Sequence, residues 1–466
     1  MNIGFFAMKK RHHEWGLIRP AILVIAAGVA MTTPARAQSG WKVGAAKVDI
    51  TPQEPIALAG YGGTRISQEI LQPIYLKALA VQDESGKIAV IVTSDLVGLS
   101  LSMVETIVQK AQEKYGLTRD RLILNYSHNH SCPVTGDVLF LYYDLNVSRK
   151  AVVERYTQRV LDQYIEVLGG AIRNLTPATL TFEQGLAGIA VNRRRSRPGG
   201  RHLPGPVDQD VPVLAVRGTD GKLRAILFGY SCHNTTLGGL QVSGDYAGYA
   251  QATLEKTYPG VIALFVEGCG GDANPLPRYQ GDDPALTHYS VELVSMYGKI
   301  LATAVDLVLH GQMNAVSGPL KTAFDKADIT FEKAPTRAEL QTKLLFDAKK
   351  PLVRLHYYAT HPMSDYGHGR VSADIPGMAR SRLEPEEGIP RSTSRVKGRY
   401  GWDTTWVAGY NNELLAYIPS LRVLNEGGYE GSDAMLEYGL PAPFGHAIEE
   451  TIAEKVDELV QETSGR

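Results

Sequence analysis

The hydrophobic pattern of the first part of the chain alternates between strand and helix signatures. Residues 102–116 carry apolar positions at three-to-four spacing, which predicts a helix with one buried face. Ser102 and Glu105 match a capping box at its start. Runs rich in Val, Ile, Leu and Tyr predict strands at residues 43–50, 75–82, 88–94 and 122–126.

The same alternation continues further along the chain. A longer helix is predicted over residues 151–168, where apolar residues again recur every three to four positions. Further strands are predicted at residues 213–216, 225–231 and 261–266, and further helices at residues 246–258 and 285–309. Strands and helices recur without a strict βαβ rhythm, which indicates an α/β (α+β) fold with a mixed β-sheet and flanking helices.

The first 37 residues have the pattern of a secretory signal peptide. Basic residues precede a short apolar run at residues 21–31, and Ala-Arg-Ala follows at residues 35–37. The apolar run is too short to span a bilayer, and no later stretch is long enough. We therefore expect cleavage after Ala37, a mature domain of residues 38–466 and a secreted or periplasmic protein without a transmembrane segment.

Composition and net charge limit the class of binding partner but do not indicate the chemistry. The formal net charge is −1, and basic and acidic residues are mixed along the chain. This excludes the basic surface typical of nucleic-acid binding and favours a small-molecule or lipid partner. Three cysteines are too few for a disulfide scaffold, so one bridge plus a spare thiol and three free thiols both remain open.

Histidines follow two of the predicted strands. His128 and His130 come after the strand at residues 122–126, and residues two apart in an extended chain face the same side. His233 follows the strand at residues 225–231. Imidazole is an ordinary zinc ligand and strand ends often carry ligand sites, so a metal site is one interpretation. Histidines with a purely structural role are the other.

Polar residues near these histidines also allow two interpretations. Asp245 follows His233 in a loop, where it either belongs to the site or caps the next helix. The segment at residues 267–275 (EGCGGDANP) opens a strand into several glycines beside carboxylates. Such a segment either passes close to a ligand or forms an ordinary tight turn.

An ordered set of motifs resembles the N-terminal catalytic domain of the neutral/alkaline non-lysosomal ceramidase superfamily. No single motif is specific, and the resemblance depends on their order. The motifs are VDITP at 48–52 with GYG at 60–62, HNHSCP at 128–133, NR at 192–193, the stretch from His233 to Asp245, GDANP at 271–275, and VAGYN at 407–411 leading to YIP at 417–419 and GYEG at 428–431. We expect the immunoglobulin-like C-terminal domain of ceramidases to be absent.

The resemblance implies a zinc ion held by two histidines, a glutamate and a tyrosine. Carried over by motif, the ligands are His128, His233 and Tyr417. Glu387 is the best positional candidate for the glutamate, although its neighbours do not resemble the family's motif. The surrounding segment, residues 352–395, is therefore predicted to be atypical.

The same resemblance implies further residues for the reaction. His130 and Arg193 match groups that line the pocket, and Tyr429 matches a tyrosine that contacts the substrate's carbonyl. Asn274 stands where the family has a serine, so a mechanism that uses that serine directly does not transfer to this chain. A metal-activated water needs no such serine.

These residues together imply an exported, zinc-dependent hydrolase. It would cleave the amide bond of an N-acyl lipid such as ceramide with a metal-activated water. One alternative is a catalytically degenerate ceramidase-like binding protein, which the poor match around Glu387 favours. Another is a metal site with thiolate ligands from Cys132, Cys232 or Cys269.

Overall fold

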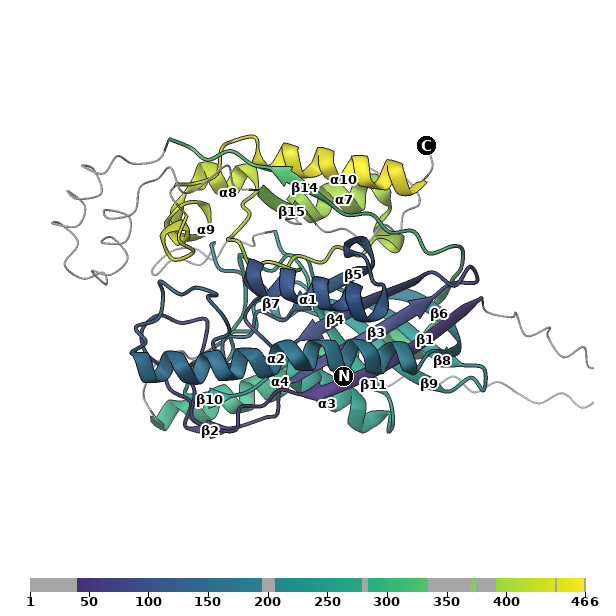
Figure 1. The fold of residues 1–466 in the computed structure, drawn as a ribbon, viewed down its shortest axis with the longest axis horizontal. Coiled ribbons are helices and arrows are strands. Elements are labelled where there is room, and N and C mark those ends of the chain that lie inside the picture. Colours follow the sequence, from purple (N-terminus) through teal and green to yellow (C-terminus); the bar gives the residue numbers. More distant parts are fainter. Residues whose placement is uncertain are drawn as a thin grey trace, which may run out of the picture. The chain divides into compact units, whose positions relative to one another are not determined.

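A curled mixed β-sheet forms the centre of the fold (Figure 1). The computed structural model describes residues 40–194, 206–278, 284–333, 370–373, 391–440 and 442–464. Within these residues the sheet has the strand order β11-β9-β8-β6-β1-β3-β4-β5, and β13 pairs with β6. Its strands are β1 (Trp41–Asp49), β3 (Tyr75–Gln82), β4 (Ile88–Ser94), β5 (Leu122–Tyr126), β6 (Thr176–Leu186), β8 (Asp210–Gly218), β9 (Leu223–Tyr230), β11 (Ile262–Glu267) and β13 (Asn314–Val316).

Long helices cover one face of this sheet. Two of them pack over the half that contains β1 and β3, and the other two over the half that contains β8 and β11. Their apolar sides supply most of the buried core between helix and sheet. In chain order the four helices are α1 (Leu101–Tyr115), α2 (Val147–Arg173), α3 (Asp245–Thr257) and α4 (Pro284–His310).

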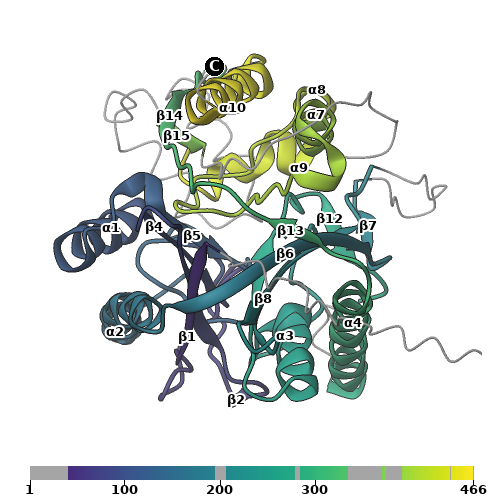
Figure 2. The same cartoon turned by 90° about the vertical axis from the view of Figure 1, so that its right-hand side faces the viewer.

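The C-terminal part of the chain lies on the other side of the sheet. Figure 2 shows α2, α3 and α4 on one side and the C-terminal helices on the opposite side. Trp406 and Ala408 pack there against buried residues of the sheet, among them Leu227 and Leu264. The elements of this part are β14 (Asp325–Asp328), β15 (Arg370–Ala373), α7 (Arg391–Tyr400), α8 (Leu421–Glu426), α9 (Gly428–Gly431) and α10 (Ile448–Ser464).

The sheet curls until its two edge strands meet. On β5 the side chain of Asn125 accepts a hydrogen bond from the backbone N–H of Glu267 at 2.9 Å, and Glu267 ends β11. Lys77 on β3 donates from its buried ammonium group to the carbonyl of Ala263 on β11 at 2.8 Å. The loops that follow β5, β9 and β11 therefore converge on one place. Short strand pairs line these loops: β2 (Glu69–Ile70) with β10 (Gln241–Val242), and β7 (Ala190–Asn192) with β12 (Ala273–Pro275).

The structure confirms the predicted fold class and corrects two details. The mixed sheet with flanking helices is present, and β3, β4 and β5 have the predicted bounds. The predicted capping box is wrong, because α1 begins one residue earlier, with Ser100 as its cap residue. Strand β6 was not predicted, although residues 178–183 (ATLTFE) alternate between apolar and polar side chains, the pattern of a half-buried strand.

Two predicted segments lie largely or wholly outside the described residues. The predicted signal peptide, residues 1–37, lies entirely outside them. Of the atypical segment at residues 352–395, the structure describes β15 and the first turn of α7. Both elements lie in the C-terminal part of the chain.

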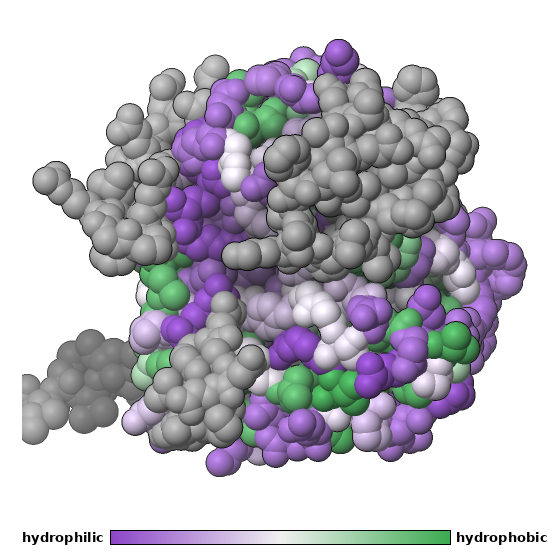
Figure 3. Space-filling view, turned by 90° about the vertical axis from the view of Figure 1, so that its left-hand side faces the viewer, coloured by the Kyte–Doolittle hydropathy of each residue, from purple (hydrophilic) through white to green (hydrophobic). Residues whose placement is uncertain are grey.

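Among the described residues, no helix combines the length and the apolar character needed to cross a bilayer. Figure 3 shows one face of the molecule, on which hydrophilic and hydrophobic residues are interspersed.

Candidate metal centre

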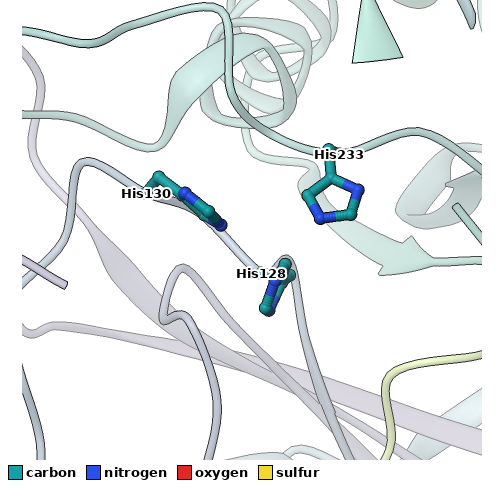
Figure 4. A group of neighbouring side chains, drawn as sticks. All are labelled: His128, His130 and His233. Carbon is teal, nitrogen blue, oxygen red and sulfur yellow. The ribbon is translucent and has the colours of Figure 1, made fainter. Parts of the chain in front are cut away.

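Three buried histidines meet where the loops after β5 and β9 converge. One ring nitrogen from each of His128, His130 and His233 lies within 4.8 Å of the corresponding nitrogens of the other two. The ring centroids of His128 and His130 are 5.0 Å apart, as are those of His128 and His233. Figure 4 shows the three rings around a common space, two from one loop and one from another. The sequence placed these histidines at strand ends, and the resemblance implied that His128 and His233 share one metal ion.

The loop after β5 turns sharply at the first histidine. His128 has a φ of 52°, in the left-handed region that non-glycine residues seldom adopt. The chain therefore does not continue as an extended strand through His130, so the predicted reason for their proximity is wrong. Their rings are nevertheless neighbours, because the turn redirects His128 toward the carbonyl of Val97, which accepts from His128 Nδ1 at 2.7 Å.

His233 is oriented by a carbonyl in the same way. The carbonyl oxygen of Gly270 accepts from His233 Nδ1 at 2.8 Å. A carbonyl only accepts, so Nδ1 carries the proton both here and in His128, and the lone pair is on Nε2. In His233 that Nε2 lies 3.1 Å from the hydroxyl of Tyr417. Carbonyl partners that fix the tautomer are typical of metal-binding histidines.

His130 lacks hydrogen-bond partners within the described part of the chain. Both of its ring nitrogens are buried, and neither donates nor accepts a hydrogen bond there. The ring packs edge-on against Tyr61 at 4.7 Å and lies directly on Gly60, where a Cβ would come within 2.3 Å of the ring. A buried polar group without a partner costs about 1–3 kcal/mol. A ligand bound at the histidine cluster would supply the partner that the His130 ring lacks.

The three imidazoles are held in the neutral form. Burial lowers the pKa of His128 to about 4, against an opposing effect of the Val97 carbonyl. Burial also lowers the pKa of His130 and of His233 well below the ordinary value, and the positive charge of Arg193 adds to both shifts. Neutral imidazole is the form that binds metal ions, so all three are available as ligands near neutral pH.

A buried carboxylate fixes the chain on both sides of His233. Glu267 accepts from the backbone N–H of Cys232 at 3.2 Å and from the side chain of Asn234 at 2.8 Å. The same Asn234 side chain donates to the carbonyl of Ser127, next to His128, at 2.7 Å. Burial raises the pKa of Glu267 well above its ordinary value. This network joins the two histidine loops.

Asp245 stabilises the loop after His233 and is not one of the residues of the histidine cluster. Its buried carboxylate accepts from the backbone N–H groups of Thr236 and Leu237 at 3.2 and 2.9 Å, and from that of Tyr246 at 2.7 Å. Helix α3 begins at Asp245 itself, so of the two interpretations the role at the helix start agrees better with the structure. The residue ties the loop after His233 to the start of α3.

The C-terminal part contributes Tyr417 to the cluster. Arg193 Nη2 donates to the Tyr417 hydroxyl at 3.2 Å, and that hydroxyl faces His233 Nε2. Burial raises the pKa of Tyr417, and the charge of Arg193 opposes this shift. Arg193 is in turn paired with Glu430, with 2.6 Å between Nε and Oε1. Sequence reasoning missed Glu430, although it lies beside Tyr429 in the GYEG motif.

Tyr429 lies beside the cluster and not in it. Its ring packs edge-on against that of Tyr417 at 5.6 Å, and 39% of the residue is exposed. Its hydroxyl donates to Glu437 at 2.6 Å. Contact with a substrate carbonyl, the role implied by the resemblance, requires this hydrogen bond to open.

The remaining predicted residues lie further away or outside the described chain. Asn274 is buried in β12, and its side-chain oxygen accepts from Arg278 at 2.9 Å. It is not part of the histidine group, and Glu387 lies outside the described residues. The cysteines at positions 132, 232 and 269 are all free thiols, and none belongs to the cluster found among the described residues.

The donor set fits a divalent metal ion. Three neutral imidazoles and one phenol hydroxyl converge, and histidine nitrogen with oxygen is a common ligand combination for zinc. The protein is thus a mixed-sheet α/β protein with a buried histidine site suited to a metal.

Comparison with known proteins identifies the family of this chain. Residues 41–276 match the model described as neutral/alkaline non-lysosomal ceramidase, N-terminal. The chain belongs to the neutral/alkaline non-lysosomal ceramidase family and is a ceramidase-like hydrolase.

Solved structures share the fold. The crystal structure of neutral ceramidase from Pseudomonas aeruginosa is similar with a TM-score of 0.67 and 17% identity, over 91% of this chain and 75% of that chain. A structure described as ceramidase complexed with C2 is similar with a TM-score of 0.65 and 16% identity, over the same shares. At these identities the likeness concerns the fold alone.

Proposed function

We propose that this protein is a zinc-dependent hydrolase that cleaves the amide bond of an N-acyl lipid such as ceramide. The observation that carries the proposal is the convergence of three neutral, buried imidazoles with the hydroxyl of Tyr417. Membership of the ceramidase family supports the lipid amide as substrate.

Each proposed ligand is oriented by a partner of its own. His128, His233 and Tyr417 would hold the zinc ion, with the two imidazoles fixed by backbone carbonyls and the phenol by Arg193. A zinc ion at this place would supply Lewis-acid chemistry, polarising the substrate carbonyl and making water a better nucleophile. The carbonyl partners already leave the Nε2 lone pairs of both imidazoles for the ion, and the hydrogen bond between His233 Nε2 and the Tyr417 hydroxyl would give way to it.

His130 and Arg193 would act on the substrate and on Tyr417. His130 is neutral and faces the same space, so its N–H can donate to the carbonyl oxygen as negative charge develops there. Arg193 keeps the Tyr417 hydroxyl in place and favours negative charge on it. The burial of all three histidines excludes water from the site, which strengthens these interactions.

The test is hydrolysis by metal-stripped and reconstituted protein. Purified full-length protein is treated with a chelator, and fatty acid release from a short-chain ceramide is measured before and after zinc is restored. We expect activity to disappear and return with about one zinc ion per chain, and the His128→Ala variant to recover neither. Zinc binding without turnover would instead identify a ceramidase-like binding protein, and a failure to bind zinc would refute the metal site.

The proposal includes export to the periplasm or the medium. It rests on the basic start, the apolar run and the Ala-Arg-Ala sequence before Gln38. N-terminal sequencing of protein expressed from the full chain should begin at Gln38, and an intact N-terminus would contradict it.

A further inference from the structure

The two ends of the histidine cluster have different surroundings. His233 lies toward the aromatic rings, since its ring stacks on Tyr417 at 6.1 Å. Tyr417 is in turn in edge-on contact with Tyr429 and Tyr438. His130 lies toward Arg278, because its backbone N–H donates to the carbonyl oxygen of Asn234 at 3.2 Å and the next residue, Thr235, is the hydrogen-bond partner of Arg278.

Arg193 has a carboxylate partner. Its Nε lies 2.6 Å from Glu430, and Arg194 lies 2.5 Å from the second oxygen of the same carboxylate. Arg194 also pairs with Glu426 at 3.2 Å. Arg422 also pairs with Glu426 at 2.8 Å and lies 3.8 Å from Asp272, so the arginines of this group are matched by carboxylates.

Arg278 is bound by neutral groups. Its Nη1 donates to the carbonyl oxygen of Thr235 at 3.1 Å and to the Thr235 hydroxyl at 2.6 Å. Its Nη2 donates to Asn274 Oδ1 at 2.9 Å, because the opposite orientation of the amide would set its NH2 group against the guanidinium donors. Within the described ranges no carboxylate forms an ion pair with Arg278.

Among the described residues, no carboxylate compensates the charge of Arg278. Burial lowers the pKa of Arg278, and the charge of Asp245 is among the effects that oppose this. The Asp245 oxygens are already engaged by backbone N–H groups of Thr236 and Leu237. The residue is half-buried. A guanidinium in this state binds carboxylates and phosphates strongly, often with two parallel hydrogen bonds.

We propose that Arg278, held by Thr235 and Asn274, binds an anionic group of the substrate, and that the preferred substrate is an N-acyl compound with a carboxylate on its amine-derived part. The apolar acyl chain would lie toward the aromatic end at Tyr417 and the carboxylate toward the end at His130. This inference rests on the proposed amide hydrolysis and specifies which amides the site prefers.

The experiment compares two substrates that differ in charge. N-dodecanoylglycine and N-dodecanoylethanolamine share the acyl chain and the amide, and only the first carries a carboxylate. We expect the zinc-loaded protein to cleave the anionic substrate with a kcat/KM at least about tenfold higher, as for a hydrogen-bonded ion pair. Arg278→Gln should remove this preference, and Arg278→Lys should restore part of it.

Matched controls separate charge recognition from folding. Arg224→Gln removes an exposed arginine, paired with Asp220 on the surface, and should leave the substrate preference unchanged. Thermal melting of Arg278→Gln verifies that the variant is folded. The variant should cleave N-dodecanoylethanolamine within about twofold of the unmodified protein, because that substrate makes no ion pair.

A binding measurement separates this inference from the proposed function. In calorimetry on metal-stripped protein, N-dodecanoylglycine should bind to Arg278→Gln at least tenfold more weakly than to the unmodified protein. If both proteins bind it equally, and both cleave the two substrates equally, the anion subsite is refuted and the hydrolase function stands. If binding depends on Arg278 but no amide is cleaved, the subsite stands and the proposed function fails.

Discussion

The histidine side and the tyrosine side of the pocket are built by different means. His128, His130 and His233 follow strands of one sheet, within the 41–276 range that matches the family. Two of them are oriented by backbone carbonyls, and buried hydrogen bonds join their loops. Tyr417 lies between short irregular segments and is positioned by the side chain of Arg193. Its placement depends on the ion pairs behind that arginine.

This difference has a physical consequence. The hydrogen bonds from His128 and His233 to backbone carbonyls are buried, so added salt hardly affects them. The ion pairs behind Tyr417, such as Arg194–Glu426, are partly exposed and are weakened by salt and by protonation of the carboxylate. Added salt should therefore affect the tyrosine side more than the histidine side.

Removing a histidine should have the largest effect. We expect His128→Ala and His233→Ala to lose bound zinc and to lower kcat/KM by about 1,000-fold or more, since each removes a ligand worth several kcal/mol. His130→Ala should retain zinc and lose about 100-fold in kcat, as expected for a lost oxyanion donor. Metal analysis and steady-state kinetics measure both effects. Loss of zinc in His130→Ala would show that three imidazoles hold the ion.

Removing the phenol hydroxyl should have an intermediate effect. Tyr417→Phe keeps the ring that stacks on His233 but removes the oxygen that faces Nε2. We expect zinc affinity to fall about tenfold and kcat/KM about 100-fold, with an unchanged melting temperature. Titration with a competing zinc chelator gives the affinity. Unchanged affinity and activity would mean that the histidine side works without Tyr417.

Acid should weaken the ion pairs that position Tyr417, and this should be the smallest of the three effects. Burial acts to raise the pKa of Glu430, but Arg193 and Arg194 outweigh it and lower that pKa below the ordinary value of 4.5. Its stabilising contribution is therefore complete above pH 4.5 and is lost as the pH falls through the lowered value. Glu430→Gln should reduce the free energy of unfolding at pH 7 by about 2 kcal/mol, less than for a fully buried pair.

The pH dependence provides the control for this last prediction. Melting temperatures of the unmodified protein and of Glu430→Gln should differ at pH 7 and converge as the pH falls below 4.5. Arg395→Gln removes a surface pair with Glu450 and should change stability much less at any of these values. A difference between the unmodified protein and Glu430→Gln that grows on acidification would contradict the assignment.

Local patterns and the ordered motifs were sufficient to predict most elements of the fold and most residues of the cluster. Apolar runs and helical spacing predicted β3, β4, β5 and the buried face of α1, because burial of apolar side chains follows local periodicity. The two histidine loops were recognisable because polar residues followed apolar strands. The ordered motifs indicated the family, which the family model confirms.

Long-range packing explains how these residues meet and which groups balance their charges. The curl of the sheet, which joins Asn125 to Glu267, brings the loops after β5 and β9 together, and no local pattern encodes that closure. The partner of Arg193 is Glu430, more than two hundred positions away, and Arg278 is held both by the nearby Asn274 and by Thr235, 43 positions away. Charge balance depends on distances in space, whereas sequence periodicity reports only which side of an element is buried.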